Sequence, residues 1–239
     1  MHRFFAKKTE EHRAVLLPEE ETHARKVLRM EAGDECQALI EGRIYAAQIA
    51  ALSPQVTVEL KDELPSTEPS VRVTLYQGVP KGDKMDFIAQ KCTEAGITRI
   101  VPVHFSRCVA QWSGKDGDKK ITRFQRIAAE AAKQSGRAMV PIIAPPIPFR
   151  ELEQCLPRHD LVLAPWEEAT GKGIPSYLTN QKDIAILIGP EGGISAEEMA
   201  LLQSWHAVPV TLGPRIFRTE TAGLAALIAL LTLTYDMGL

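Results

Sequence analysis

Two neighbouring stretches of this sequence decide the fold: Ile186-Leu187-Ile188-Gly189-Pro190-Glu191-Gly192-Gly193 and Leu212-Gly213-Pro214-Arg215-Ile216-Phe217-Arg218-Thr219-Glu220-Thr221-Ala222. Each is an apolar run typical of a β-strand that stops at glycine and proline and leads into a helix-like segment. In open α/β sheets, small ligands bind just beyond the carboxyl ends of the strands. Because the two turns lie close together in the sequence, we expect them to line one pocket, which favours a cofactor-binding enzyme.

The first turn has no standard nucleotide motif. It lacks the GxGxxG spacing of a dinucleotide site and the Gly-Lys-Ser/Thr ending of a P-loop. Its glycines at 189, 192 and 193 allow a tight turn and a close approach to a ligand. An ordinary strand-to-helix turn with Ser195 as N-cap would show the same pattern. Taken alone, this turn leaves both interpretations open.

The second turn places charge at the start of an apolar helix. Arg218 and Glu220 are costly to bury there unless they are paired or used. Alternatively, Thr219 caps the helix and Glu220 interacts with its positive end. The concentration of Arg215, Arg218 and Glu220 favours a binding or catalytic site over simple capping.

At these residues the sequence resembles a known family. GPEGG followed by LGPRIFRTETA is similar to the signature of the SPOUT-class methyltransferases, and more narrowly to that of the bacterial ribosomal RNA small subunit methyltransferase E family. Residues 2–5, residues 23–30 with Gly33-Asp34, and residues 81–85 resemble the same family in the same order. Phe217 stands where the family usually has leucine, which would alter the packing of an adenine pocket. The resemblance covers the chain nearly end to end.

The resemblance implies an enzyme that transfers a methyl group from S-adenosyl-L-methionine to N3 of a specific uridine in 16S rRNA, within the small ribosomal subunit. It implies a small N-terminal PUA-like β-barrel domain that binds RNA, residues 1–70, followed by a SPOUT α/β methyltransferase domain, residues 71–239. The family ties its C-terminal part, here about residues 160–239, into a deep trefoil knot. Periodicity alone would predict an unknotted Rossmann-like sheet, because knots are very rare.

Composition limits the location of the protein. The chain has 239 residues, of which 45% are hydrophobic, and a net charge of −2, so no global attraction to nucleic acid is expected. No apolar signal-peptide segment follows the charged N-terminus. The cysteines show neither CxxC pairing nor histidines at metal spacing, so we expect free thiols, no metal and a cytoplasmic protein; they are Cys36, Cys92, Cys108 and Cys155.

The apolar run at residues 222–233 is shorter than the roughly 20 residues needed to cross a bilayer. It is apolar around most of its circumference, so we expect a second layer of protein to cover it. The resemblance implies a homodimer that buries this helix beside the cofactor pocket. A charge at Ala226 or Leu230 is then expected to disrupt the pair.

Periodicity predicts the elements along the chain. A helix at 19–30 precedes short strands, which suggest a small barrel or sandwich, and a polar linker follows at 62–69. From Val71 onward strands and helices alternate, which favours a mainly parallel sheet with helices on both faces. The expected strands are 35–39, 43–50, 56–60, 71–75, 100–104, 141–144, 161–164, 184–188 and 208–212, and the further helices are 85–95, 120–136 and 149–155.

The resemblance assigns the cofactor to three loops: the two turns above and the end of the strand at Ala164-Pro165. Leu212, Ile216 and Phe217 would form a slot for adenine. A side chain added at Gly192 or Gly213 would enter the ligand's space. The expected cofactor residues are Ala164, Pro165, Gly189, Pro190, Glu191, Gly192, Gly193, Leu212, Gly213, Ile216, Phe217, Arg218, Thr221 and Ala222.

The proposed chemistry suggests the catalytic residues. Uridine N3 carries a proton at neutral pH, so a base must remove it or cations must stabilise the developing anion. Arg218 is the favoured stabiliser, because a guanidinium stays charged and forks onto planar acceptors. Glu191 and Glu220 are candidate bases. A structural pair between Arg218 and Glu220 that fixes the loop is the alternative.

Basic residues gather in one part of the chain. Residues 107–137 contain eight basic and three acidic residues. Ile121, Phe124 and Ala128 lie on the apolar stripe of the helix, and the basic residues lie on its exposed sides. Phosphate binding is a natural use of such a cluster, although a solvated helix face is the alternative. The expected RNA-binding residues are Arg3, Arg25, Lys81, Lys84, Arg107, Arg123, Arg126, Lys133 and Arg137.

Three other functions are compatible with part of the pattern. A SPOUT methyltransferase that acts on the 2′-hydroxyl of RNA ribose would share the cofactor loops. A non-catalytic RNA-binding ribosome-assembly protein would keep a vestigial pocket. A nucleotide-cofactor oxidoreductase is disfavoured, because no dinucleotide fingerprint follows the early strands.

Overall fold

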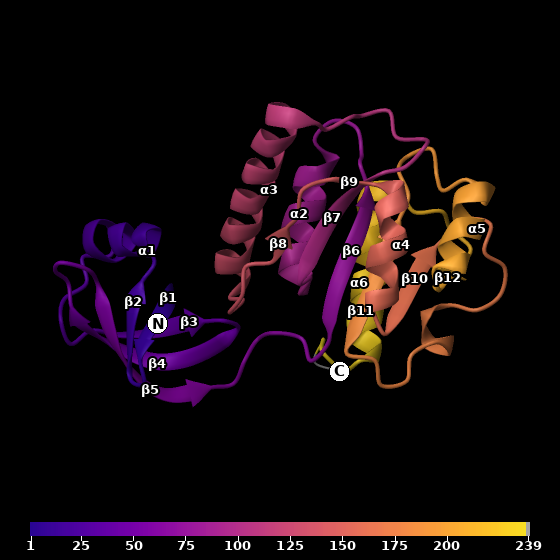
Figure 1. Ribbon diagram of the computed structural model, residues 1–239. Helices are drawn as coiled ribbons and strands as arrows, with labels where there is room; N and C mark the ends of the chain where they lie inside the picture. Colours follow the sequence, from indigo (N-terminus) through magenta and orange to yellow (C-terminus); the bar gives the residue numbers. More distant parts are fainter. Residues whose placement is uncertain (238–239) are drawn as a thin grey trace. The chain divides into compact units, whose positions relative to one another are not determined.

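The N-terminal part of the chain closes into a five-stranded barrel in a computed structural model that describes residues 1–237 (Figure 1). The strand order is β1-β2-β5-β4-β3, and all pairings are antiparallel except that of β1 with β3. Phe4, Val58 and Ile49 are almost fully buried inside the barrel. The strands are β1 (His2–Glu10), β2 (Arg13–Leu16), β3 (Glu35–Ile40), β4 (Arg43–Ala51) and β5 (Thr57–Leu64).

Three sequence predictions fail in the barrel. No strand was expected at β1 or β2, because β1 buries only Phe4 and its exposed, largely charged residues hide the alternation. The helix expected at 19–30 divides into α1 (Pro18–Thr22) and a π-helical turn, η1 (His23–Val27). The linker begins later than expected, because Leu64 still pairs with Ile44 in β5.

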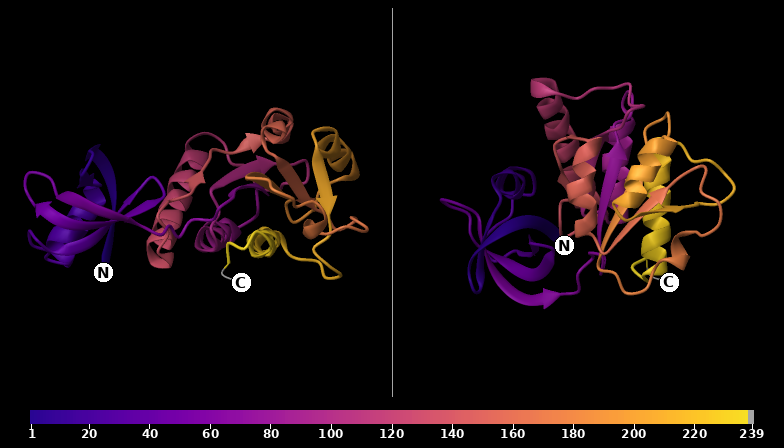
Figure 2. Two further views of the ribbon diagram at one scale, coloured as in Figure 1. Left: turned by 90° about the horizontal axis from the view of Figure 1, so that it is seen from below. Right: turned by 45° about the vertical axis from the view of Figure 1, so that its right-hand side comes forward.

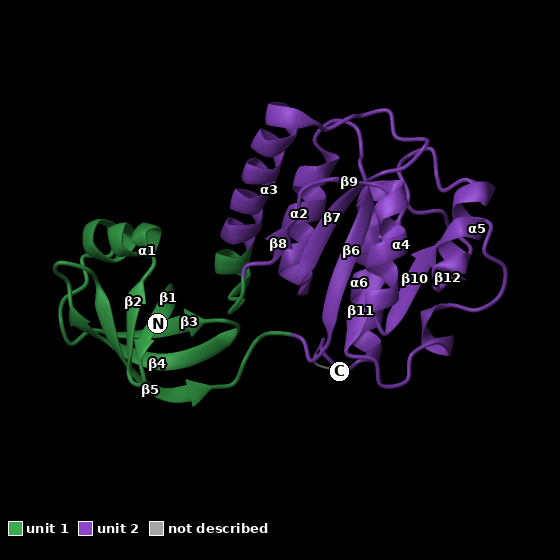
Figure 3. Ribbon diagram, viewed as in Figure 1, with its two compact units in different colours: residues 1–68, 132–139 green, residues 69–131, 140–239 purple. Residues whose placement is uncertain are grey.

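The barrel belongs to a discontinuous unit. Unit 1 comprises residues 1–68 and 132–139, and unit 2 comprises residues 69–131 and 140–239 (Figure 3). Within unit 1, the Glu68 carboxylate accepts hydrogen bonds from the backbone N–H groups of Ala138, at 2.8 Å, and Met139, at 3.1 Å. The methyl group of Ala138 is buried in a small cluster with Leu39 and Ile44. The segment 132–139 is therefore part of the barrel's own packing.

Unit 2 is built on a seven-stranded sheet in which neighbouring strands of the described residues pair in parallel, which confirms the predicted class. Its order is β12-β10-β11-β6-β7-β8, and β9 pairs with β7. The central strands bury both faces, as apolar runs such as Ile184 to Ile188 require. The strands are β6 (Arg72–Gly78), β7 (Arg99–His104), β8 (Ile142–Ile143), β9 (Ile147–Pro148), β10 (Leu161–Pro165), β11 (Asp183–Ile188) and β12 (Ala207–Val210).

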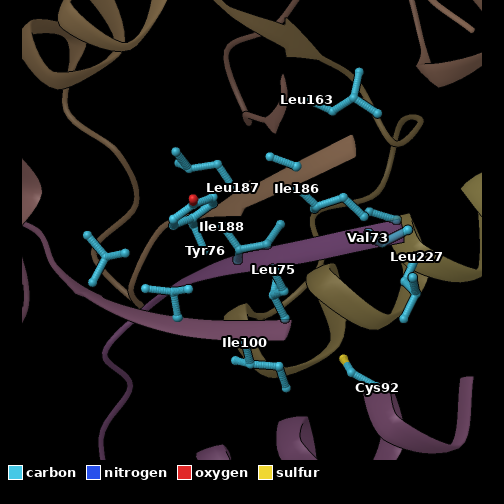
Figure 4. Close-up of a cluster of buried hydrophobic side chains, with 14 of the residues drawn as sticks. Val73, Leu75, Tyr76, Cys92, Ile100, Leu163, Ile186, Leu187, Ile188 and Leu227 are labelled. Carbon is cyan, nitrogen blue, oxygen red and sulfur yellow. The ribbon is translucent and has the colours of Figure 1, made fainter. Parts of the chain in front are cut away.

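Helices cover both faces of this sheet. Helices α2 and α6 pack against each other on one face of the sheet, and helices α4 and α5 lie on the other face (Figure 2). Leu227 of α6 and Cys92 of α2 join the core with Leu75 and Ile100 of the sheet (Figure 4). The helices are α2 (Lys84–Ala95), α3 (Gly114–Ser135), α4 (Leu152–Cys155), α5 (Ala196–Ser204) and α6 (Thr219–Leu233), with short 3-10 turns η2 (Phe149–Glu151), η3 (Leu156–Arg158) and η4 (Ile174–Ser176).

Helix α3 is longer than predicted, and the helices do not meet the requirements of a membrane span within the described residues. Helix α3 begins at Gly114, before the expected residue 120, and ends at Ser135. Within residues 1–237, none of the helices combines the length and the apolar character that a bilayer crossing requires. The trefoil knot stays a prediction.

Candidate active site

The carboxyl ends of β10, β11 and β12 lead into one pocket of about 900 Å³ in unit 2. The loop after each strand contributes to its walls, as the two opening stretches of sequence predicted. Of the residues expected to hold a cofactor, the structure brings together Pro165, Gly189, Pro190, Glu191, Gly193, Leu212, Gly213, Ile216, Phe217, Arg218 and Ala222.

Three expected residues do not line the pocket. Ala164 is fully buried within the sheet. Gly192 faces away: a Cβ on it would lie 3.0 Å from Cβ of Arg107, so the expectation that a side chain here would enter the pocket is wrong. The Thr221 hydroxyl instead donates to the carbonyl oxygen of Arg218, at 3.1 Å, inside the first turn of α6.

Other lining residues were missed. Trp166 and Glu167 directly follow the expected strand end at Pro165, so extending that loop in the sequence would have found them. The Trp166 indole donates to the carbonyl oxygen of Ile194, at 3.2 Å, and so ties the first loop to the second. The remaining lining residues outside the expected cofactor set are Lys84, Ala169, Ile188, Ile194, Thr211, Pro214, Arg215 and Thr219.

The floor of the pocket is held by close packing between strands. A Cβ on Gly78, at the end of β6, would lie 2.4 Å from the backbone nitrogen of Pro190, so only glycine fits there. The Thr219 hydroxyl donates to the carbonyl oxygen of Gly189, at 2.7 Å, and accepts from the Gln77 amide, at 2.9 Å. Thr219 is therefore not the N-cap of α6. That position belongs to Arg218.

The first turn is structural as well as pocket-lining. Ser195 is the N-cap of α5 and forms a capping box with Glu198, as expected for an ordinary strand-to-helix turn. Glu198 also accepts a hydrogen bond from the backbone N–H of Ser106, at 2.7 Å. The Arg107 guanidinium donates to the carbonyl oxygen of Gly192, at 2.9 Å. Arg107 therefore braces this turn.

Two acids expected as possible bases face a lysine instead. The Lys84 ammonium lies 2.8 Å from Oε1 of Glu191 and 3.5 Å from Oε2 of Glu220. Burial opposes ionisation of Glu191, but hydrogen bonds from Lys84 and from the backbone N–H of Lys81 prevail and lower the pKa of its carboxyl. The hydrogen bond to Glu191 raises the pKa of Lys84. The charges of both groups are thus fixed near neutral pH.

Two arginines beside the pocket carry no such pairing. Arg215 and Arg218 are exposed and line the pocket, and within residues 1–237 neither forms an ion pair. The expected alternative, a pair between Arg218 and Glu220, does not form, because Glu220 faces Lys84. Arg218 is therefore a free cation at the start of α6.

The basic cluster at residues 107–137 differs from its predicted arrangement. Arg137 lies beyond α3 and is 3% exposed, so its placement on an exposed helix side is wrong. Its guanidinium is paired with Glu68, and Lys133 contacts the buried Glu20 at 2.6 Å. Both cations satisfy buried carboxylates within unit 1. They therefore act in the packing of this unit.

The other expected RNA-binding residues also have intramolecular contacts. In unit 1, Arg25 bonds to Glu21 and Arg3 bonds to Gln37. In unit 2, Arg123 is paired with Asp86. Arg126 is well exposed and lies 3.9 Å from Glu130, and Lys81 is exposed. Arg126, with 76% of its side chain exposed, is more open to solvent than Arg123 and Lys133.

Comparison with known proteins identifies the family. Residues 67–231 match the family model of the RNA methyltransferase domain. The chain is 34% identical over 224 residues to the ribosomal RNA small subunit methyltransferase E of Bacillus subtilis strain 168. The aligned region covers 89% of this chain and 87% of that protein. The chain belongs to the ribosomal RNA small subunit methyltransferase E family.

Solved structures agree with this assignment to the methyltransferase E family. A ribosomal RNA small subunit methyltransferase E from Neisseria gonorrhoeae bound to S-adenosyl methionine is 29% identical, with a TM-score of 0.80 over 98% of both chains. A putative methyltransferase from Legionella pneumophila in complex with the same cofactor is 30% identical, with a TM-score of 0.77 over 96% of both chains. The predicted fold, a PUA-like barrel followed by a SPOUT-type α/β domain, is confirmed, and the chain is an enzyme of the RNA methyltransferase class.

Proposed function

We propose that this methyltransferase transfers a methyl group from S-adenosyl-L-methionine to N3 of a uridine in 16S rRNA, within the small ribosomal subunit. The observation that carries the proposal is the position of Arg218, a free cation at the edge of a pocket built from three strand-end loops. The family relatives named above support the same substrate class.

The pocket fits the cofactor. Its volume of about 900 Å³ lies within the range of small-molecule sites. A Cβ on Gly213 would meet nothing within 4 Å, so main-chain groups of this loop are open to a ligand. Leu212, Ile216 and Phe217 supply apolar surface for adenine, and the turn at 189–193 and Pro165 would hold the rest. When bound, the cofactor supplies an electrophilic methyl group on a sulfonium.

The protein's own residues prepare the uracil. Loss of the N3 proton leaves negative charge on the ring oxygens, and Arg218 can donate two parallel hydrogen bonds to such planar acceptors. Glu191 is a poor base, because its carboxylate already accepts from Lys81 and Lys84. Glu220 is directed at Lys84 and does not line the pocket. Electrostatic stabilisation by Arg218 is therefore favoured over proton removal by an acid.

We also propose that the protein is a homodimer through α6. Ile228 and Leu233 of this helix are 39% and 40% exposed, and both are apolar. Ala226 and Leu230 are fully buried within unit 2, so their expected place in the dimer interface is wrong. The interface is instead assigned to the side of α6 that carries Ile228.

RNA contact is proposed for the exposed cations of unit 2, led by Lys81, Arg126 and Arg215. Their role is local, because the net charge of the chain is −2. A cytoplasmic location, where ribosomes and a reducing environment are found, is supported by the four free cysteines.

The test is methylation of small ribosomal subunits with cofactor labelled in the methyl group. The digested 16S rRNA should contain label only in 3-methyluridine. Label in an alkali-stable dinucleotide would indicate a 2′-O-methylated ribose and support the alternative SPOUT activity. Binding of subunits without incorporation of label would favour a non-catalytic assembly protein and contradict the proposal.

A further inference from the structure

The ammonium of Lys84 lies where three segments of the pocket meet. Lys84 is the first residue of α2, Glu191 belongs to the turn after β11, and Glu220 lies in the first turn of α6. The nitrogen contacts Oε1 of Glu191 at 2.8 Å and Oε2 of Glu220 at 3.5 Å. One side chain thus connects the two loops that decide the fold to a third element far from both in the sequence.

The position of Lys84 is unfavourable without these partners. A cation at the first residue of a helix faces the positive end of the helix dipole. Asp83, the preceding residue, makes no side-chain cap for α2. Two carboxylates from two other segments offset this unfavourable position.

The carboxylates in turn depend on the lysine. Oε2 of Glu220 is buried and, among residues 1–237, has no hydrogen bond; the Lys84 ammonium lies 3.5 Å from it. Oε1 of Glu191 accepts hydrogen bonds from the Lys84 ammonium and from the backbone N–H of Lys81, the latter at 3.0 Å. Because both acids lie within 3.5 Å of one nitrogen, removing that nitrogen leaves two close negative charges. These charges would push the turn at 191 away from α6.

We propose that Lys84 is a positioning residue: its ammonium holds Glu191 and Glu220 together and so sets the separation of the two cofactor loops. Glu191 lines the pocket beside Gly189, and Glu220 lies two residues after Arg218. The inference rests on the proposed binding of S-adenosyl-L-methionine in this pocket. It assigns Lys84 to loop spacing and not to RNA.

The other charged neighbours are accounted for. Asp83, the N-cap of α2, and Asp86 within α2 face Arg123, and Cys108 follows β7. Burial raises the pKa of the Cys108 thiol, so it stays neutral. The carboxylates of Glu191 and Glu220 are therefore the acidic groups that contact the Lys84 ammonium.

The first experiment measures cofactor affinity by titration calorimetry at pH 7.5. Lys84→Met should weaken binding of S-adenosyl-L-methionine by at least about tenfold, or about 1.4 kcal/mol. Lys84→Arg should stay within about threefold of the wild type, because it keeps the charge. Lys91→Met is the matched control: this lysine lies on the same helix, is paired with Glu94, and does not line the pocket. Its affinity should be unchanged.

The second experiment uses Glu220→Gln, whose effect should reverse sign with the residue at 84. In the wild type it removes one tie and should weaken binding by about threefold. In the Lys84→Met background it removes the repulsion and should strengthen binding by a similar factor. Glu220 does not line the pocket, so its effect on the cofactor is indirect. The wild-type arm stays decisive even if Lys84→Met fails to fold.

The pH dependence gives a third readout. Lys84 lowers the pKa of Glu191, so in the wild type the ion contacts hold above that pKa and are lost only as the pH falls through it. In Lys84→Met the Glu191 carboxyl loses the cation that lowers its pKa, so its pKa should rise, and lowering the pH from 8 to 5.5 should strengthen cofactor binding. Lys91→Met should show no such gain.

These outcomes separate two failures. A folded Lys84→Met variant with wild-type affinity, or Glu220→Gln effects of equal sign in both backgrounds, would overturn the positioning role. A loss that neither lower pH nor Glu220→Gln reverses would assign Lys84 to simple packing by its stem. A wild-type protein that binds no S-adenosyl-L-methionine would instead contradict the proposed function.

Discussion

Replacing Arg218 should slow methyl transfer while leaving the fold unchanged. The side chain is exposed, and no carboxylate within residues 1–237 pairs with it. Its removal therefore leaves no buried partner unsatisfied, and the free energy of unfolding should change by no more than about 0.5 kcal/mol. Any large effect must then come from the reaction.

The expected size follows from the lost hydrogen bonds. Arg218→Lys keeps one charge but loses the planar fork, so we expect a rate loss of at least about tenfold, or about 1.4 kcal/mol of transition-state stabilisation. Arg218→Ala also loses the charge. Its loss should reach about 100-fold, as for removal of one preorganised donor to an oxyanion.

The assay is a single turnover on small ribosomal subunits at saturating cofactor, so that neither cofactor binding nor product release limits the rate. Cofactor affinity should stay within about threefold of the wild type in both variants. Arg150→Ala, an exposed arginine of η2 that does not line the pocket, is the control. A folded Arg218→Ala enzyme with the wild-type rate would remove this residue from the mechanism.

Gly213 and Gly33 both have a left-handed backbone, with φ of 106° and 97°, so alanine at either position should lower the melting temperature by a similar amount. Only Gly213→Ala should weaken cofactor binding in calorimetry, because its Cβ would enter the open pocket. Equal affinities in the two variants would misplace the cofactor. Ile228→Glu should convert a dimer into folded monomers by light scattering, and a wild type that is monomeric at micromolar concentration and fully active would refute the dimer. Glu68→Gln removes the carboxylate that faces the buried guanidinium of Arg137 and should lower the free energy of unfolding, measured with urea, by about 2 to 3 kcal/mol. Glu63→Gln, from an exposed pair, should change it by less than about 1 kcal/mol, and equal effects would contradict the argument.

The sequence predicts those parts of the fold that depend on local pattern. The apolar run at 184–188 reads as a buried strand because both of its faces are covered in the sheet. Strand β1 escapes prediction, because only Phe4 among its residues is buried. The left-handed conformation of Arg29, two residues after the end of η1, has no signal in the residue type.

The residues of the candidate site likewise fall into those that a local sequence pattern predicts and those that it does not. Turns rich in glycine at strand ends indicate a pocket whatever the partners, so the loops at 189–193 and 212–218 were found. Ion pairs between distant residues carry no local signal. Lys84 and Arg137 were therefore assigned to RNA, although their charges face Glu191 and Glu68. Likewise, an all-apolar helix such as α6 does not reveal which of its sides is covered by its own chain.

The discontinuity of unit 1 sets the order in which the protein can fold during its synthesis. Residues 1–68 leave the ribosome first, but the segment 132–139 that completes their packing is made later. At a synthesis rate of about 5 to 20 residues per second, the intervening stretch of roughly sixty residues takes about 3 to 13 seconds. During that time Leu39 and Ile44 lack the methyl group of Ala138, and Glu68 is still without its arginine. The nascent barrel must wait for the middle of the chain before its last surface closes.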